Sequence, residues 1–254
     1  MVGRRGGPGG EVVTAITGAG TPEEVWRPFL GALRLPRLDV EPAPAHAVVV
    51  APHPDDEILG VGGLLNLLAA AGTRVEVLSV TDGEASHPGG SVCPQELAPR
   101  RAAETSAALA VLGVCAGVRR LHLPDGGREA LEQPVVDALR VEAGTWLLGP
   151  WAGDGHPDHE AVGRGCATVA ERDGARLLGY PVWAWHWASP GDPRLAWSRA
   201  VQVDLPPDVR ATKVRAIAEF VTQIQPLGPD PADAPVLPPY VLERFSRPWE
   251  VLLE

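Results

Sequence analysis

From His46 onward the sequence alternates between short β-branched runs and helical stretches of roughly 10 to 15 residues, and this alternation constrains the fold most. Strands are expected at 46–51, 74–80, 119–123 and 145–148. Helices are expected at about 58–71, 95–112, 130–143 and 159–171. Such alternation produces βαβ units, so we predict an α/β fold: a Rossmann-like parallel sheet with helices on both faces.

The flanking regions follow other patterns. Thr21, Pro22 and Glu24 have the order of an N-cap, a first-turn proline and a capping glutamate, which predicts a short helix ending near Leu33. After Arg176 we expect added elements: strands at 177–187, 200–205 and 250–253, a helix at 207–221 and a proline-rich loop at 226–239. We expect residues 1–20 to be a flexible leader and residues 21–254 to form a single domain with its core at about 46–205.

Charge and cysteine content narrow the class of protein. Lys and Arg number 22 against 32 Asp and Glu, a net charge of −10, and no basic run could follow a phosphate backbone. Nucleic acids and anionic membranes are therefore not expected partners. No apolar stretch approaches the roughly 18 residues of a membrane span, and no apolar run follows MVGRRGGPGG, so we expect the protein not to be exported. Three cysteines without C-x-x-C spacing fit a reducing compartment. We predict a cytoplasmic protein.

Polar segments follow four of the predicted strands. They are HPDDE (53–57), TDGEASH (81–87), LPDGG (123–127) and GDGHPDH (153–159). Because open parallel sheets bind ligands at the carboxyl ends of their strands, we expect all four segments to border one site.

A nucleotide loop is one interpretation of the glycines in the first of these regions. Gly60 and Gly62 imitate a dinucleotide fingerprint, but the third glycine position is Leu65, and the acidic residues before Gly60 would repel a pyrophosphate. No P-loop motif occurs. We expect the glycines instead to let the helix pack closely on the sheet.

A metal site is the stronger interpretation of HPDDE, although its carboxylates could also be ordinary helix caps. A second His-Pro-Asp sequence, at 156–158, follows another predicted strand. Two histidines and a carboxylate with an open position for water are typical of catalytic zinc. Because no G-x-S-x-G motif occurs, a metal-activated water is the expected nucleophile.

The motifs PHPDDE and GHPDH resemble the PIG-L/LmbE family of zinc-dependent N-acetylglucosaminyl-type deacetylases, and the similarity covers about residues 46–253. Weaker matches are TDGE (81–84), Arg101-x-x-Glu104 and LPDG (123–126). The resemblance implies a Rossmann-like sheet and a divalent metal ion, most simply Zn²⁺. It further implies that His53, Asp56 and His159 are metal ligands. It makes Asp55 the general base and His156 the residue that stabilises the oxyanion.

Two further acidic residues stand in the second motif. Asp158 is expected either to orient His156 and hold it in its charged form, or to cap the following helix. Some family members have an aromatic residue where this chain has Asp154, so the local charge here is more negative.

Substrate contacts are predicted at three residues. Trp183, Trp185 and Trp187 alternate with other residues and would share one face of a strand, which could be core or an aromatic wall for a sugar. We name Trp185 as the candidate from this face. Arg101 and His87 are the others; Arg101 could instead pair with Glu104, and His87 could be a solvated loop residue.

The sequence thus predicts a metal-dependent hydrolase that removes an N-acetyl or other N-acyl group from an amino-sugar-containing small molecule. One alternative is a metal-containing protein that binds a sugar or regulates without catalysis. A second is an amidase acting on a non-sugar N-acyl substrate. Phosphoester hydrolysis is disfavoured because few basic residues lie near the motifs.

Overall fold

A computed structural model describes residues 18–254; residues 1–17 of the predicted leader lie outside the described residues. Seven strands form one sheet: β1 (His46–Ala51), β2 (Arg74–Thr81), β3 (Gly117–Leu123), β4 (Trp146–Pro150), β5 (Arg176–Tyr180), β6 (Ala200–Asp204) and β7 (Trp249–Leu253). Their order is β3-β2-β1-β4-β5-β7-β6. The first five strands are parallel, and β7 runs antiparallel to both neighbours. The predicted parallel α/β sheet with C-terminal additions is confirmed.

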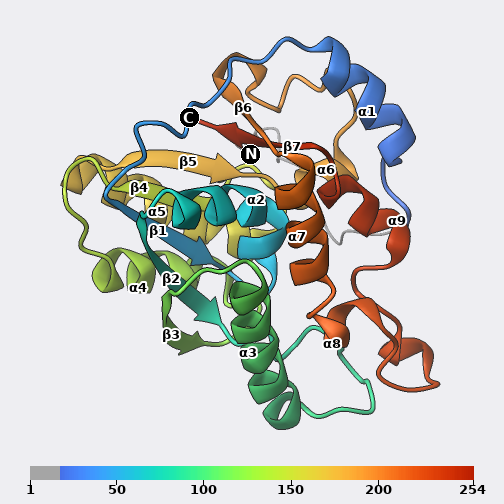
Figure 1. Ribbon diagram of the computed structural model, residues 1–254. Coiled ribbons are helices and arrows are strands. Elements are labelled where there is room, and N and C mark those ends of the chain that lie inside the picture. Colours follow the sequence, from blue (N-terminus) through green and yellow to red (C-terminus); the bar gives the residue numbers. More distant parts are fainter. Residues whose placement is uncertain (1–17) are drawn as a thin grey trace, which may run out of the picture.

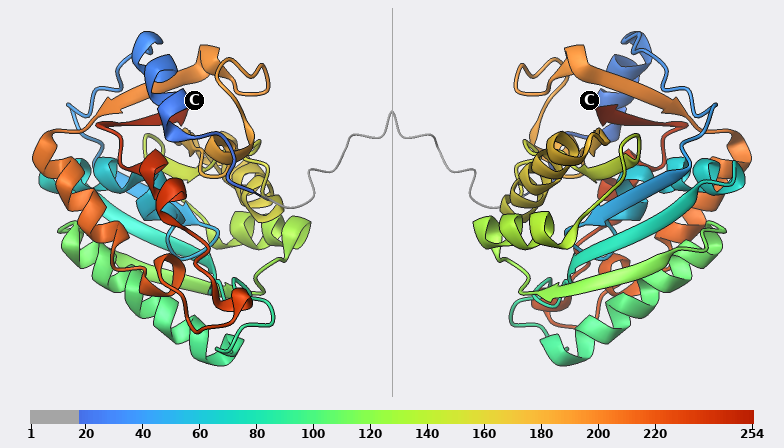
Figure 2. Two further views of the ribbon diagram at one scale, coloured as in Figure 1. Left: turned by 90° about the vertical axis from the view of Figure 1, so that its right-hand side faces the viewer. Right: turned by 90° about the vertical axis from the view of Figure 1, so that its left-hand side faces the viewer.

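Helices cover both faces of this sheet. The helices of the described residues are α1 (Glu23–Ala32), α2 (Asp56–Ala70), α3 (Pro94–Val111), α4 (Glu132–Ala138), α5 (Pro157–Asp173), α6 (Ala184–Trp187), α7 (Pro207–Ile217), α8 (Val221–Ile224) and α9 (Pro239–Leu242), with short 3₁₀ segments at Arg128–Leu131, Trp197–Arg199, Pro231–Asp233 and Glu243–Phe245. The elements α2, α3 and α7 lie on one side, and α4 and α5 on the other (Figures 1 and 2).

The central strand explains why its sequence is almost wholly apolar. Ala47 and Val49 belong to the core under α2 and α7, whereas Val48 and Val50 belong to the core under α4 and α5. Successive side chains of a strand point to opposite faces, so a strand covered on both sides needs apolar residues at every position.

The strand order reverses between β1 and β4. The chain crosses from β1 to β2 and β3 on one side and then returns to place β4 on the other side of β1. Crevices for ligands form at such a point, outside the carboxyl ends of the two strands.

Four local predictions are wrong. The helix expected over 207–221 ends at Ile217, and Val221 begins the separate helix α8. Thr21 is not the N-cap of α1: that position is Pro22, and the Thr21 hydroxyl donates instead to Ala188 O at 2.5 Å. The helix expected over 130–143 ends at Ala138. The strand expected over 177–187 ends at Tyr180, and the chain then turns into the short helix α6.

No helix within residues 18–254 has both the length and the apolar content that crossing a membrane requires. Cys93, Cys115 and Cys166 are all free thiols, and Cys166 is buried beneath β4.

Candidate metal centre

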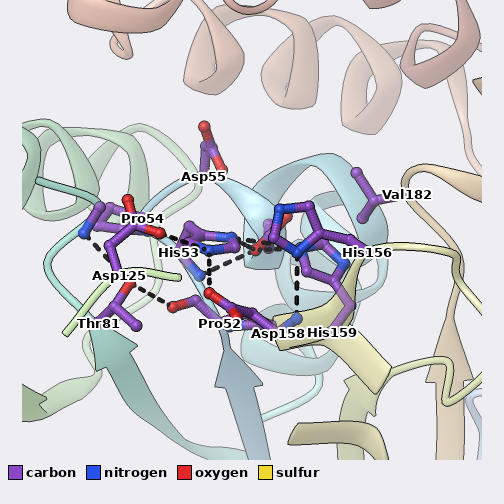
Figure 3. Close-up of polar contacts among 12 residues, drawn as sticks. Pro52, His53, Pro54, Asp55, Thr81, Asp125, His156, Asp158, His159 and Val182 are labelled. Carbon is purple, nitrogen blue, oxygen red and sulfur yellow. Dashed lines mark hydrogen bonds and ion pairs between the residues drawn. The ribbon is translucent and has the colours of Figure 1, made fainter. Parts of the chain in front are cut away.

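The two His-Pro-Asp turns, residues 53–55 and 156–158, meet because β1 and β4 are neighbours. The strands pair in parallel, with Val49 opposite Leu148, so both end at the same edge of the sheet. His53 and Asp158 are 105 positions apart in the chain, but His53 Nε2 lies 3.2 Å from Asp158 Oδ2 (Figure 3). The topology therefore brings together the residues that the two motifs predicted.

The first turn ends in an unusual backbone conformation. Asp55 has φ 131°, a region that residues other than glycine rarely occupy. Its carbonyl accepts hydrogen bonds from Ile58 N and Leu59 N at 2.9 Å, so α2 begins at Asp56. The Asp55 side chain does not cap the helix. Its carboxylate is therefore available to a ligand in the neighbouring cavity.

Three donor atoms converge where the turns meet. Asp56 Oδ2 lies 3.2 Å from His53 Nδ1 and 3.2 Å from His159 Nε2, and the two nitrogens are 3.3 Å apart. Donors that hold a tetrahedral ion at 2.0–2.1 Å are about 3.3 Å from one another. All three side chains are buried. Their spacing fits a divalent ion held by three protein ligands.

Further carboxylates orient both histidines toward that point. His159 Nδ1 lies 2.8 Å from Asp154 Oδ2, and His53 Nε2 lies 3.2 Å from both Asp158 Oδ2 and Asp125 Oδ1. Each ring can donate its proton to these carboxylates, which leaves the lone pairs of His53 Nδ1 and His159 Nε2 facing Asp56. Carboxylates commonly orient metal-binding histidines in this way. The donor set therefore matches a cation.

The charges of the centre also favour a cation. Burial lowers the pKa of His159, but the nearby carboxylates of Asp56 and Asp154 outweigh burial and raise that pKa to about 9. When no metal ion is bound, these carboxylates therefore favour the protonated form of His159. A divalent ion can replace that proton because metal binding and protonation compete for the same lone pair.

Asp55 lies beside the ligands but pairs elsewhere. Arg101 Nη2 donates to Asp55 Oδ2 at 3.0 Å, while the same guanidinium donates to Gly83 O and Pro54 O at 2.7 and 2.5 Å. Burial raises the pKa of Asp55 to about 7, although Arg101 acts in the opposite direction. Arg101 does not pair with Glu104, whose carboxylate accepts hydrogen bonds from Thr222 instead.

His156 and Asp158 differ from what their sequence context predicted. His156 is itself the N-cap of α5, and its Nδ1 accepts a hydrogen bond from Asp158 N at 3.3 Å. The Asp158 carboxylate accepts hydrogen bonds from the amides of Gly126 and Arg128 and lies 3.2 Å from His53 Nε2. The expectation that Asp158 caps the helix is therefore wrong, and the hydrogen bond that joins it to His156 comes from its backbone N–H rather than from its carboxylate.

The expectation that His156 is positively charged is wrong as well. Burial and the neighbouring His159 and His53 lower the pKa of His156 to about 3. A neutral ring that accepts at Nδ1 carries its proton on Nε2. His156 can therefore still donate a hydrogen bond.

A cavity of about 230 Å³ opens beside the convergent donors. Its lining includes His53, Asp55, Asp56, Leu59, Ala85, Ser86, Arg101, Asp125, His156, Val182, Trp183, Gln223, Val236 and Leu237. The predicted substrate contact Arg101 is among them. The same cavity therefore contains candidates for the metal ligands, the general base and the oxyanion donor.

Two predicted substrate contacts do not line this cavity. Trp185 is buried in the core, where its ring packs edge-on against Trp26 at 5.2 Å and Arg247 lies over it at 4.4 Å. The tryptophan that reaches the cavity is Trp183. His87 is neither in the lining nor a solvated loop residue: it is buried, and its Nδ1 contacts Ser86 Oγ at 3.0 Å.

Several site residues escaped the sequence prediction. Asp125 belongs to the polar segment after β3, so its position at a strand end could have identified it. Gln223 and Leu237 come from the C-terminal region and carry no motif. The sequence indicates only added negative charge at Asp154, whereas in the structure its carboxylate accepts hydrogen bonds from Val182 N and Ala184 N and contacts His159.

Known proteins resemble this chain in sequence. It is 34% identical over 123 residues to diacetylchitobiose deacetylase of Thermococcus kodakarensis, a match that spans 45% of each protein. It is 31% identical over 226 residues to 1D-myo-inositol 2-acetamido-2-deoxy-alpha-D-glucopyranoside deacetylase of Corynebacterium glutamicum, covering 71% of this chain and 75% of that relative.

Solved structures share the fold. N,N'-diacetylchitobiose deacetylase of Pyrococcus horikoshii has a TM-score of 0.54 at 21% identity and covers 78% of each chain. The zinc-inhibited form of teicoplanin deacetylase has a TM-score of 0.54 at 19% identity, over 70% of this chain and 85% of that one. The protein TT1542 of Thermus thermophilus has a TM-score of 0.51 at 27% identity, over 71% and 80%.

The family model described as GlcNAc-PI de-N-acetylase, or PIG-L, matches residues 48–170, which contain both His-Pro-Asp turns. Together with the relative that is 31% identical over three quarters of its length, this match shows that the chain belongs to the PIG-L family.

Proposed function

We propose that this chain is a zinc-dependent deacetylase that hydrolyses the N-acetyl amide of an amino-sugar-containing small molecule. The observation that carries the proposal is the convergence of His53 Nδ1, Asp56 Oδ2 and His159 Nε2 beside a cavity that Asp55 and His156 also line. The named relatives act on N-acetylated amino sugars, which supports the substrate class.

His53, Asp56 and His159 would hold the ion. Two histidines, one carboxylate and an open position are the ligand set of catalytic zinc sites, so Zn²⁺ is the proposed ion. When bound, a divalent ion polarises a carbonyl and lowers the pKa of water from about 15.7 to about 7.

Asp55 is the proposed general base. Its carboxylate takes a proton from the attacking water as the oxygen of that water bonds to the amide carbon. It then returns the proton to the amide nitrogen as the C–N bond breaks, so that a free amine and acetic acid result, and the acid releases its remaining proton to solvent to give acetate. Arg101 holds the carboxylate in place through the 3.0 Å contact.

His156 is the proposed oxyanion donor. Negative charge develops on the carbonyl oxygen during attack, and the Nε2–H of neutral His156 can donate to it. Such a donor, fixed before the reaction begins, costs no reorganisation when the charge forms. The Asp158 N–H holds the ring in this tautomer.

Acetate release tests the function. Purified protein is assayed on a panel of N-acetylated sugars, sugar conjugates and non-sugar N-acetyl amides, with chelator, and with zinc restored after chelation. We expect about one zinc per chain and metal-dependent release from the amino sugars. Native protein without metal, or release only from the non-sugar amides, would contradict the proposal. The cytoplasmic location remains a prediction that cell fractionation can test.

A further inference from the structure

Helix α2, which carries the ligand Asp56, is interrupted after its first turn. Val61 has φ −137° and ψ 17°, values outside the helical region. The break leaves a short first segment, residues 56–60, and a longer second segment, residues 62–70. A segment of about one turn has almost no stability of its own, so its position depends on what holds its two ends.

A buried ion pair occupies the break. Lys213 Nζ donates to Leu59 O at 2.8 Å, at the end of the first segment. Glu250 accepts from Gly63 N at 2.7 Å and from Leu64 N at 2.9 Å, at the start of the second. Lys213 Nζ also donates to Glu250 Oε1 at 2.7 Å. The pair thus satisfies backbone groups on both sides of the break, which would otherwise be buried without partners.

The glycines around the break make room for this arrangement. A side chain at Gly63 would place its Cβ 2.5 Å from Leu205 Cδ2 and 3.0 Å from Glu250 Oε1. The close approach therefore requires glycine at position 63, the last glycine of the G-V-G-G sequence, whereas a Cβ at Gly60 would meet the Tyr180 ring instead. Lys213 and Glu250 are only 2% and 4% exposed. They come from α7 and β7, beyond residues 48–170, to which the family model matches.

We propose that Lys213 and Glu250 are positioning residues for the metal centre, an inference that rests on the proposed metal-dependent function. The preceding turn holds one end of the first segment, where Arg101 binds Pro54 O, and Lys213 holds the other at Leu59 O. Asp56 lies between these two anchors. Its Oδ2 must stay about 3.3 Å from both imidazole nitrogens to share an ion, so a shift of this single turn weakens metal binding.

The experiment measures the Zn²⁺ affinity of Glu250→Gln by competition with a chromophoric chelator, at a temperature where circular dichroism shows all proteins folded. The matched control is Glu23→Gln. Glu23 is 3% exposed and accepts hydrogen bonds of 2.7 to 3.0 Å from Arg247, but in the described structure it makes no hydrogen bond to α2. Both variants leave a buried cation unpaired and should lower the unfolding temperature.

We expect Glu250→Gln to bind Zn²⁺ 10 to 100-fold more weakly than wild type, a range typical of residues that orient ligands. Glu23→Gln should bind within about twofold of wild type at the same temperature. The absorption spectrum of bound Co²⁺ should change in Glu250→Gln alone, because it reports ligand geometry.

A double variant, Lys213→Met with Glu250→Gln, guards against misfolding, since it leaves no buried charge unpaired. It should fold and still bind Zn²⁺ at least 10-fold more weakly. Unchanged affinity in the double variant, or equal weakening in Glu23→Gln, overturns the positioning role while wild-type binding upholds the metal centre. Failure of wild type to bind Zn²⁺ overturns the metal centre itself, and the positioning role with it.

Discussion

The first and second His-Pro-Asp turns have the same three residues, but the helix that follows begins at a different residue of each motif. Helix α2 begins at Asp56, after the aspartate, whereas α5 begins at Pro157, directly after the histidine. The third residue is therefore outside the helix in the first turn, with φ 131° at Asp55, and inside the helix in the second, at Asp158. A shift of the helix start changes which side chains face the shared centre.

This shift gives the two turns complementary parts of one site. The first supplies the donor atoms of His53 and Asp56, with Asp55 beside them. The second supplies His159 one helical position after its aspartate, and directs His156 into the cavity. Two copies of one motif thus build an asymmetric centre, which separate substitutions at matching positions can dissect.

Substituting the histidine that begins each turn, His53 or His156, should give the largest difference between the two turns. His53→Ala is expected to abolish both zinc binding and activity, because it removes one of three donor atoms. His156→Ala should keep about one zinc per chain and lose about 10² to 10³-fold in kcat, the usual cost of one oxyanion donor. Elemental analysis and acetate release on the same preparations check this. Loss of zinc in His156→Ala would instead make that histidine a ligand.

Substituting the aspartate that ends each turn, Asp55 or Asp158, should affect different properties: catalysis in the first turn and metal binding in the second. Asp55→Asn should keep the metal and lose about 10² to 10⁴-fold in kcat, as expected for a general base. Asp158→Asn should retain the base but weaken metal binding through His53. Zinc titration alongside kcat separates the two effects, and an active Asp55→Asn enzyme would reassign the base.

The carboxylates that orient the metal-binding histidines should contribute unequally to zinc affinity. Within residues 18–254, Asp154 is the one carboxylate that contacts His159 Nδ1, whereas both Asp158 and Asp125 contact His53 Nε2. We expect Asp154→Asn to weaken zinc binding by about 10 to 100-fold and Asp158→Asn to do so by less, since Asp125 remains. Chelator competition measures both; equal losses would mean that Asp125 cannot substitute.

The difference in stability between glycine and alanine at the third position of each turn should be the smallest effect, and its sign should reverse between the two turns. Asp55→Gly should be more stable than Asp55→Ala by about 1 to 3 kcal/mol, because both lose the Arg101 pair but only alanine retains the strain of positive φ. At Asp158, inside the helix, alanine should exceed glycine by about 0.5 to 1 kcal/mol. Urea denaturation of the four proteins tests this; the same preference at both positions would contradict it.

The alternating strands and helices were predictable because each carries its own periodic pattern and punctuation. The tryptophans at 183, 185 and 187 misled because their alternation extends over only five residues. Tertiary packing decided there: Trp26 Nε1 donates to Trp185 O at 2.9 Å and its ring packs against Trp185, fixing a helical turn.

The convergent site residues were predictable for a similar reason: both motifs follow strands whose carboxyl ends meet. The direction of the Asp158 carboxylate was not, because it depends on the amides of Gly126 and Arg128, which belong to a loop distant in sequence. The role of Asp154 likewise depends on amides at residues 182–184 that no motif identifies.

The pairing of β1 with β4 also has a consequence for folding kinetics. His53 and Asp56 follow one strand and His159 follows the other, so the complete ligand set forms only after these two strands pair in register. This contact is distant in sequence, and such contacts form slowly because a long loop must close first. Binding of Co²⁺ during refolding would therefore time the assembly of the centre of the sheet, separately from the formation of its helices.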